Sequence, residues 1–148
     1  MKKSRPLIGI IAAEAEYVFF SNALNTIQKE LFAANMDAAV FSSLMMSGNA
    51  EFDAAENSVY DLVDFDLLDG IIIFSSSIND ATSRERLIAR IKSDFKGPVV
   101  SFDSQVDGFA NCLYNYEPVA DMMVSHIMDH HGCKVIDFVG GPKDEFHD

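Results

Sequence analysis

Two histidines four residues apart, His126 and His130, have a spacing that could support metal chemistry. On a helix this spacing places both rings on one face, as in a metal-binding HExxH motif. The glutamate that follows the first histidine of that motif is Ile127 here. We therefore interpret these residues as histidines near the end of a helix, where the carboxy-terminal dipole favours positive charge, and we predict no metal site.

Motifs for nucleophilic, nucleotide or dinucleotide chemistry do not occur in the sequence. There is no GxSxG elbow and no GxxxxGK[ST] loop, and the first apolar run, Leu7 to Ile11, continues into Ala12 to Glu16 rather than into a glycine-rich turn. A phosphoacceptor domain would carry an aspartate where Phe74-Ser75 stand. We expect a binding module rather than an enzyme, with no cofactor.

Four residues follow apolar runs and could contact a small molecule: Phe19, Phe20, Ser75 and Asp103. Ser75 could bond a hydroxylated ligand, although serines after a strand also form turns and helix caps. Asp103 could bond ligand hydroxyls or lie on the surface at the start of a loop. Phe20 fits a buried helix stripe better than its neighbour, so Phe19 is the better aromatic candidate.

Five apolar runs predict the strands that must position these residues, and segments with helical periodicity separate them. The expected strands are Leu7 to Ile11, Ala38 to Phe41, Ile71 to Phe74, Val99 to Phe102 and Lys134 to Val139. The expected helices are Phe19 to Ala34 with Asn35 as its cap, Phe52 to Val63, one capped by Thr82 or Ser83, and one with Pro118 in its first turn that closes at Gly132; Asn111 to Asn115 forms a brief extended segment. In the second helix we expect four residues to face inward: Phe52, Ala55, Val59 and Leu62.

Alternating strands and helices predict an α/β fold, an open parallel sheet of five strands with helices on both faces. We expect the strand order 2-1-3-4-5 and a single unit over residues 1–148. Ligands of such sheets bind beyond the carboxyl ends of the strands. The candidate residues Phe19, Ser75 and Asp103 all follow those ends.

Charge and composition restrict the partners. The formal net charge of -12 repels phosphate backbones, so we expect no nucleic acid contact by this segment. No apolar run reaches the roughly 20 residues of a membrane-spanning helix, and the opening residues lack a signal-peptide core. We therefore expect a cytoplasmic protein with no membrane contact. The two cysteines, Cys112 and Cys133, are expected to be buried or partly buried thiols.

Four segments in order resemble the effector-binding module of the LacI/GalR family, which is similar to type I periplasmic sugar-binding proteins. They are Leu7 to Ile11, Asp69 to Ile73, Gly97 to Val100, and Gly132 to Pro142. The last looks like the family's "GHxxIafigGP" signature, and Asn115 matches the asparagine of its "vDN" segment. The resemblance covers the whole chain and implies the amino-terminal lobe of such a sensor.

Carried over residue by residue, the resemblance implies that Phe19 and Phe20 occupy the aromatic ligand-stacking positions of the family's "NPFF" segment. Ser75 falls at a polar or small position, and Asp103 matches an aspartate that bonds ligand hydroxyls. Three departures concern the ligand: the asparagine-proline before the two aromatics is absent, Tyr114 replaces an aspartate, and Cys133 replaces a histidine. The implied effector is a sugar or nucleoside.

The resemblance also implies parts that this sequence lacks. We expect the helix-turn-helix of family repressors and the second lobe to be absent, so that the chain is a fragment or one half of a larger signalling protein. The output is transcription or another signal, such as that of a diguanylate cyclase or histidine kinase. The resemblance implies a homodimer. The alternatives are a dimerising interaction module without a ligand and an enzyme of flavodoxin-like architecture.

Overall fold

The computed structural model describes residues 5–44 and 49–139. The chain divides into two units, Met1–Leu113 and Tyr114–Asp148. The first unit holds a parallel sheet with its helices. The described part of the second, residues 114–139, holds one helix and the segment that follows it.

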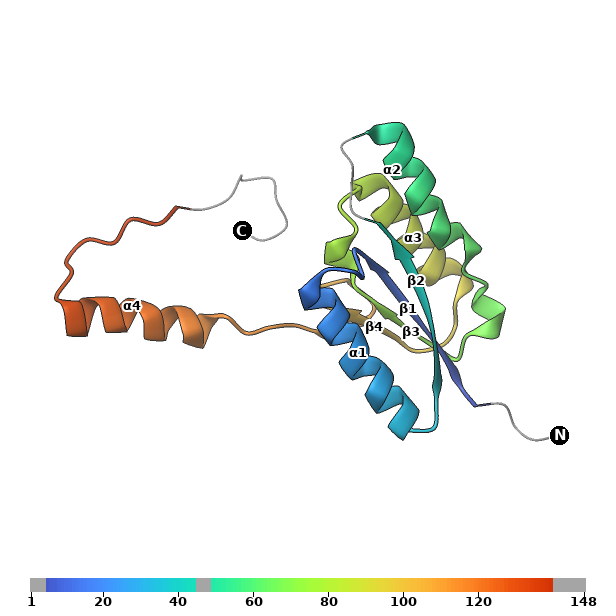
Figure 1. Ribbon diagram of the computed structural model, residues 1–148, viewed down its shortest axis with the longest axis horizontal. Coiled ribbons are helices and arrows are strands. Elements are labelled where there is room, and N and C mark those ends of the chain that lie inside the picture. The colour runs from blue at the N-terminus through green and yellow to red at the C-terminus, as the bar shows by residue number, and fades with distance from the viewer. Residues whose placement is uncertain (1–4, 45–48, 140–148) are drawn as a thin grey trace. The chain divides into compact units, whose positions relative to one another are not determined.

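The sheet of the first unit has five parallel strands in the order β2-β1-β3-β4-β5 (Figure 1). The strands are β1 (Leu7–Ala13), β2 (Asp37–Ser43), β3 (Gly70–Ile73), β4 (Val99–Phe102) and β5 (Ala110–Cys112). This confirms the predicted α/β class and strand order. The central strands β1 and β3 are the most apolar runs of the sequence, as strands covered on both faces require.

The fifth strand is not the segment that the sequence predicts. It is the brief extended segment, at Ala110–Cys112, whereas residues 134–139 form no strand and are exposed. A strand persists only where its backbone groups pair with a neighbour. Apolar, β-branched composition predicted a strand over 134–139, but no pairing with that segment occurs among the described residues.

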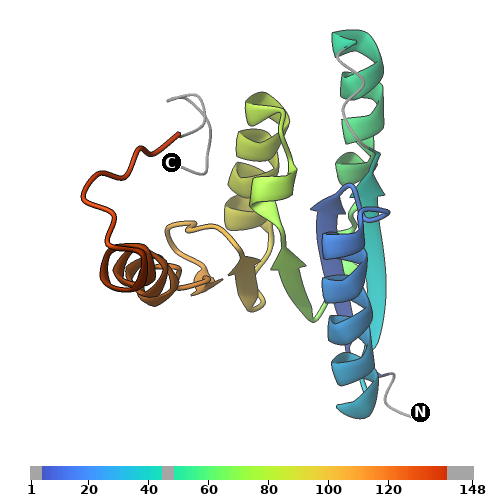
Figure 2. The same ribbon diagram turned by 60° about the vertical axis from the view of Figure 1, so that its left-hand side comes forward.

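Four α-helices and three short 3-10 helices occur among the described residues, and all but the last α-helix lie between strands. The α-helices are α1 (Val18–Ala33), α2 (Ala50–Asn57), α3 (Ala81–Asp94) and α4 (Glu117–His131); the 3-10 helices are η1 (Ser58–Leu62), η2 (Phe65–Leu67) and η3 (Ser75–Ser77). Figures 1 and 2 show α1 and α3 on different sides of the sheet. Within the described residues no helix is long and apolar enough to cross a membrane.

Each face of the sheet buries its own apolar cluster, because successive strand residues point to opposite faces. On one face Ile10 and Ala12 of β1 pack with Leu24 of α1 and with Phe74. The partly buried residues of this cluster include Phe20, Ile27 and Leu31, which confirms the predicted stripe of the first helix.

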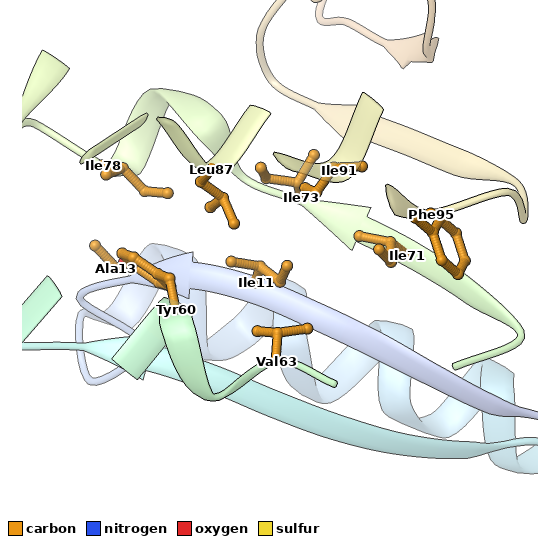
Figure 3. Close-up of a cluster of buried hydrophobic side chains, with 10 residues drawn as sticks. All are labelled: Ile11, Ala13, Tyr60, Val63, Ile71, Ile73, Ile78, Leu87, Ile91 and Phe95. Carbon is orange, nitrogen blue, oxygen red and sulfur yellow. The ribbon is translucent and has the colours of Figure 1, made fainter. Parts of the chain in front are cut away.

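The opposite face is covered by α3 and the η1 region (Figure 3). Ile11 and Ile73 point from the strands toward Leu87 and Ile91 of α3, and Tyr60 closes the cluster from η1. The two apolar clusters together hold the carboxyl ends of β1 and β3 in fixed positions.

The buried side of the second helix differs from the prediction. The buried residues are Asp53, Asn57, Tyr60 and Val63, whereas Phe52, Ala55 and Leu62 are exposed and Val59 is partly buried. The α-helix ends at Asn57 and the chain continues as a 3-10 helix, which has three residues per turn and changes the inward positions. Arg90 fixes this arrangement by donating hydrogen bonds to the carbonyls of Tyr60 at 2.9 Å and Val63 at 2.6 Å.

The ends of the helices follow local rules with one correction. Asn35 has a left-handed φ of 60°, and the Met36 amide donates to the Leu31 carbonyl at 2.9 Å, so the first helix ends in a Schellman motif. The cap of α3 is Asp80, whose carboxylate accepts a hydrogen bond from the Ser83 amide at 2.8 Å. The prediction that Thr82 or Ser83 is the cap is therefore wrong, because Asp80 already satisfies the free amide in the first turn.

The last helix ends as the sequence predicts. Pro118 lies in its first turn, and Gly132 caps its carboxyl end with a left-handed φ of 65°. Glycine adopts this conformation without steric cost.

Candidate functional site

The carboxyl ends of β1 and β3 are joined by a serine of η3. The Ser77 hydroxyl accepts a hydrogen bond from the Ala13 amide at 2.8 Å and donates to the Phe74 carbonyl at 2.7 Å. Ser77 is itself buried. This pair of bonds fixes the loop after β3 against the end of β1, so the polar residues that follow both strands lie at one edge of the sheet.

Glu14 follows β1 in a conformation that L-residues rarely adopt. Its φ is 56°, and its amide donates to the Ser43 carbonyl at 2.9 Å. The Asn79 side chain donates to Glu14 Oε1 at 3.5 Å, a long and weak contact. Desolvation by burial, and then the neighbouring Glu16 carboxylate, raise the pKa of Glu14 above its ordinary value. Both effects disfavour the ionised form of the Glu14 carboxyl group.

Tyr60 ties the ends of β1 and β2 from the other side. Its side chain is 2% exposed, its hydroxyl donates to the Ala12 carbonyl at 3.0 Å, and it shares a hydrogen bond with the Ser43 hydroxyl at 2.8 Å. Desolvation raises the Tyr60 pKa above its ordinary value, more than the hydrogen bond from Ser43 lowers it. The phenol is a neutral structural group beneath the strand ends.

Asp103 follows β4 with a left-handed φ of 65°. Its amide donates to the Cys112 carbonyl of β5 at 2.9 Å, so the turn belongs to the sheet rather than to a free loop. Its side chain is partly exposed. The structure thus places the predicted aspartate at the carboxyl edge, with its backbone held and its carboxyl group accessible.

Ser75 lies at the predicted strand end but its hydroxyl faces other protein groups. The residue is 2% exposed and is hydrogen-bonded to the Ser104 hydroxyl. Ser101 also donates to the Ser104 carbonyl at 2.7 Å, which completes a buried serine cluster between β3 and β4. Within the described residues, the Ser76 hydroxyl beside it is buried and has no hydrogen-bond partner.

The two phenylalanines after β1 lie in different environments. Phe19 is 51% exposed, and its ring meets Phe20 edge-on at a centroid distance of 5.3 Å. Phe20 is partly buried and meets Phe74 at 5.9 Å, and Phe74 meets Phe102 at 4.8 Å. The first two of these contacts are edge-to-face, which is a favourable geometry for aromatic rings. The rings form a continuous row under the strand ends, of which Phe19 is the exposed member.

Sequence reasoning did not find Glu14, Asn79, Tyr60 or Ser104. The position of Glu14 directly after the first strand was the available signal, because it lies in the segment where ligands of parallel sheets bind. Its left-handed backbone and its contact with Asn79 depend on tertiary structure. The pairing of Ser75 with Ser104 likewise needs two strands to lie side by side.

The histidines lie in the second unit, near the end of α4. The rings of His126 and His130 are 4.8 Å apart, so they share a helix face as predicted. His131 also turns toward His126, with 3.3 Å between their Nε2 atoms. Within the described residues, no group of three or more potential ligands is arranged to hold a metal ion.

Both cysteines are exposed free thiols, so the expectation that they are buried or partly buried is wrong. Cys112 lies on β5, a three-residue strand at the edge of the sheet with an exposed surface, and Cys133 follows α4 in the second unit. Neither segment is covered by other described elements to the extent that β1 and β3 are.

The carboxyl edge of the first unit therefore combines two held acidic residues, an amide, an exposed aromatic ring and a buried serine cluster. A scan against protein-family models finds no match to the chain, and a search of curated proteins finds none either.

Proposed function

We propose that this chain is the amino-terminal ligand-sensing lobe of a LacI/GalR-like regulatory protein, with a sugar or nucleoside as its effector. The ligand binds at the carboxyl edge between Phe19 and Asp103, and a second lobe closes over it. Closure of two lobes around a ligand is a common means of coupling binding to an output. The output is transcription or another signalling activity, such as that of a diguanylate cyclase or histidine kinase.

The observation that carries this proposal is the position of the left-handed residues. Among the described residues, Glu14, Asn35 and Asp103 have positive φ without being glycine. Asn35 is explained by the end of α1. The other two follow β1 and β4 at the same edge of the sheet. Such conformations cost about 1–3 kcal/mol and cluster at ligand clamps, which supports a binding role for this edge.

A binding role is favoured over catalysis because two buried hydroxyls near the strand ends, those of Ser75 and Ser43, have structural partners. Ser75 bonds Ser104, and Ser43 bonds Tyr60, so neither hydroxyl is paired with a basic residue that could activate it. We accordingly propose a protein that is not an enzyme, that needs no cofactor and whose described segment does not contact nucleic acid or membrane. We place it in the cytoplasm.

We propose that the protein forms a homodimer through β2 and the neighbouring helix. β2 is an edge strand of the sheet, and Val40 in it is 39% exposed. Unpaired strand edges with apolar side chains favour association with another chain. The same observation favours the second candidate function, a dimerising interaction module without a ligand.

A ligand titration tests the proposal. Chemical shifts of backbone amides are followed while neutral sugars and nucleosides are added to the chain, and to the Asp103→Asn protein, whose asparagine tolerates a left-handed backbone. We expect weak binding that perturbs the strand ends, because small-molecule sites bury most of the ligand between converging walls. Asp103→Asn should weaken it, and Asp66→Asn, an exposed control, should not. Shifts confined to other surfaces would contradict the proposal.

A further inference from the structure

Three histidines gather at the carboxyl end of α4, in the second unit. The ring centroids of His130 and His131 lie 4.8 Å and 5.0 Å from that of His126, but the two contacts differ. The His130 ring is tilted by 33° against the His126 ring. The His131 ring stands at 78° to it and brings its Nε2 atom to 3.3 Å from the His126 Nε2 atom. The ring nitrogens that meet therefore belong to His126 and His131, not to the pair with the four-residue spacing.

The separation of these two nitrogens has the value that a tetrahedral zinc site requires. Zinc binds imidazole nitrogen at about 2.0–2.1 Å and takes four ligands in a tetrahedron, so two nitrogens on it lie about 3.3–3.4 Å apart. The right angle of a square-planar copper site brings them to about 2.9 Å. The observed 3.3 Å also accommodates a hydrogen bond between the rings, in which case a zinc ion takes the place of the shared proton.

The surroundings of this pair favour a cation and leave space for its remaining ligands. Both histidines are exposed and lie in the last two turns of α4, where the helix dipole is negative. An open hollow of about 240 Å³ adjoins His126, and Asp129 contributes to its lining. Since a water molecule takes about 30 Å³, the hollow has room for water ligands. The described part of the chain offers no third protein ligand.

We propose that His126 and His131 bind one zinc ion through their Nε2 atoms, with water in the other two positions. Imidazole is among the ligands that suit zinc. Because the two histidines are five residues apart, the ion links the last residue of α4 to the turn before it, and it stabilises this end of the helix by binding the folded form. The site lies in the second unit and does not depend on the proposed function of the first.

A zinc titration of the whole chain, prepared without a histidine tag, tests the site. Calorimetry at about pH 7.5, where a free imidazole is mostly neutral, gives the stoichiometry and the affinity. An excess of Mg²⁺ is present throughout, because it occupies carboxylate sites in preference to imidazole. We expect one zinc ion per chain. Imidazole ¹H–¹⁵N spectra should show His126 and His131 bound through Nε2, with the proton on Nδ1.

Single substitutions then assign the ligands. His126→Gln and His131→Gln each remove one ligand, and either should weaken zinc binding by at least about tenfold, since loss of a mere hydrogen-bond partner of a ligand already costs about 10–100-fold. His130→Gln is the matched control, because it removes an adjacent imidazole and keeps both facing nitrogens. Cys133→Ser removes the exposed thiol nearby. Both controls should bind zinc as the wild type does, and circular dichroism checks that every variant keeps its helices.

Four results would overturn this assignment. The first is a titration that does not saturate at one zinc ion per chain. The second is binding that survives His131→Gln and is lost in His130→Gln, which would place the ion on the pair with the four-residue spacing. The third is binding lost in Cys133→Ser, which would place it on the thiol. The fourth is one zinc ion for two chains with faster sedimentation, which would show that a second copy, and not water, completes the coordination.

Discussion

Replacement of Tyr60 by phenylalanine tests the assignment of that phenol as the group that ties β1 to β2. The change removes the bonds to the Ala12 carbonyl at 3.0 Å and to the Ser43 hydroxyl at 2.8 Å, and leaves the ring in place. A buried hydrogen bond contributes about 1 kcal/mol net. Loss of both should therefore lower the free energy of unfolding by about 2 kcal/mol.

Urea denaturation followed by circular dichroism measures this loss. Since the slope for small proteins is about 1–3 kcal/mol per molar urea, the midpoint should fall by about 1 M. Tyr116→Phe is the matched control, because Tyr116 is exposed, and it should leave the midpoint unchanged. A shift below about 0.2 M for Tyr60→Phe would refute the reasoning that these two bonds stabilise the strand ends.

The same residue predicts a dependence on alkaline pH. The folded pKa of Tyr60 is raised above the ordinary value of 10.0, so its contribution to stability is fully present below pH 10.0 and is lost as pH rises through the folded pKa. Above pH 10.0 the unfolded chain releases the proton while the folded chain retains it. The wild-type midpoint should fall in this range more steeply than that of Tyr60→Phe; parallel pH curves would contradict the burial of the hydroxyl.

Three further predictions concern the ends and edges of the first unit. Asp80→Ala removes the cap of α3 and should lower the free energy of unfolding, measured by urea denaturation, by about 1 kcal/mol. Because the folded pKa of Asp80 is lowered, the stabilisation by this cap is present above the ordinary value of 3.8 and should vanish as pH falls through the folded pKa. Phe20→Ala should destabilise the protein by about 2–4 kcal/mol, whereas Phe19→Ala should change the free energy of unfolding far less, because the Phe19 side chain is 51% exposed. Equal losses of stability in thermal melts would contradict the assignment of Phe19 as the exposed ring of the row. Val40→Lys should shift a dimer to monomer in sedimentation velocity, and an unchanged dimer would place the interface away from β2.

The sheet was predictable because its central strands are continuous apolar runs. β4 has the predicted bounds, and β1 and β3 differ from theirs by a few residues. Strand identity at the edge was not predictable. β5 is short and exposed, while the apolar residues 134–139, which look more like a strand, have no strand partner among the described residues. The amino-acid composition of a segment shows its tendency to form a strand, but a strand forms only where a neighbouring strand supplies hydrogen-bond partners.

The candidate site was predictable as a location but less so as a set of side chains. Asp103 and Phe19 are accessible at the expected edge, because sheet topology alone brings strand ends together. Ser75 is buried against Ser104, a contact between η3 and the segment after β4 that no local pattern encodes. Glu14 has a left-handed backbone and its amide bonds Ser43 of β2, a contact that also needs the assembled sheet.

The pairing of β1 with both β2 and β3 has a consequence for the order of folding. Leu7 of β1 pairs with Asp37 of β2, and one helix lies between them in the sequence. Ile8 of β1 pairs with Gly70 of β3, and a further strand and helix lie between those two residues. Closing a longer loop costs more chain entropy before any contact compensates it. The β1-α1-β2 unit should therefore form first, and the pairing of β1 with β3 should be the slower step.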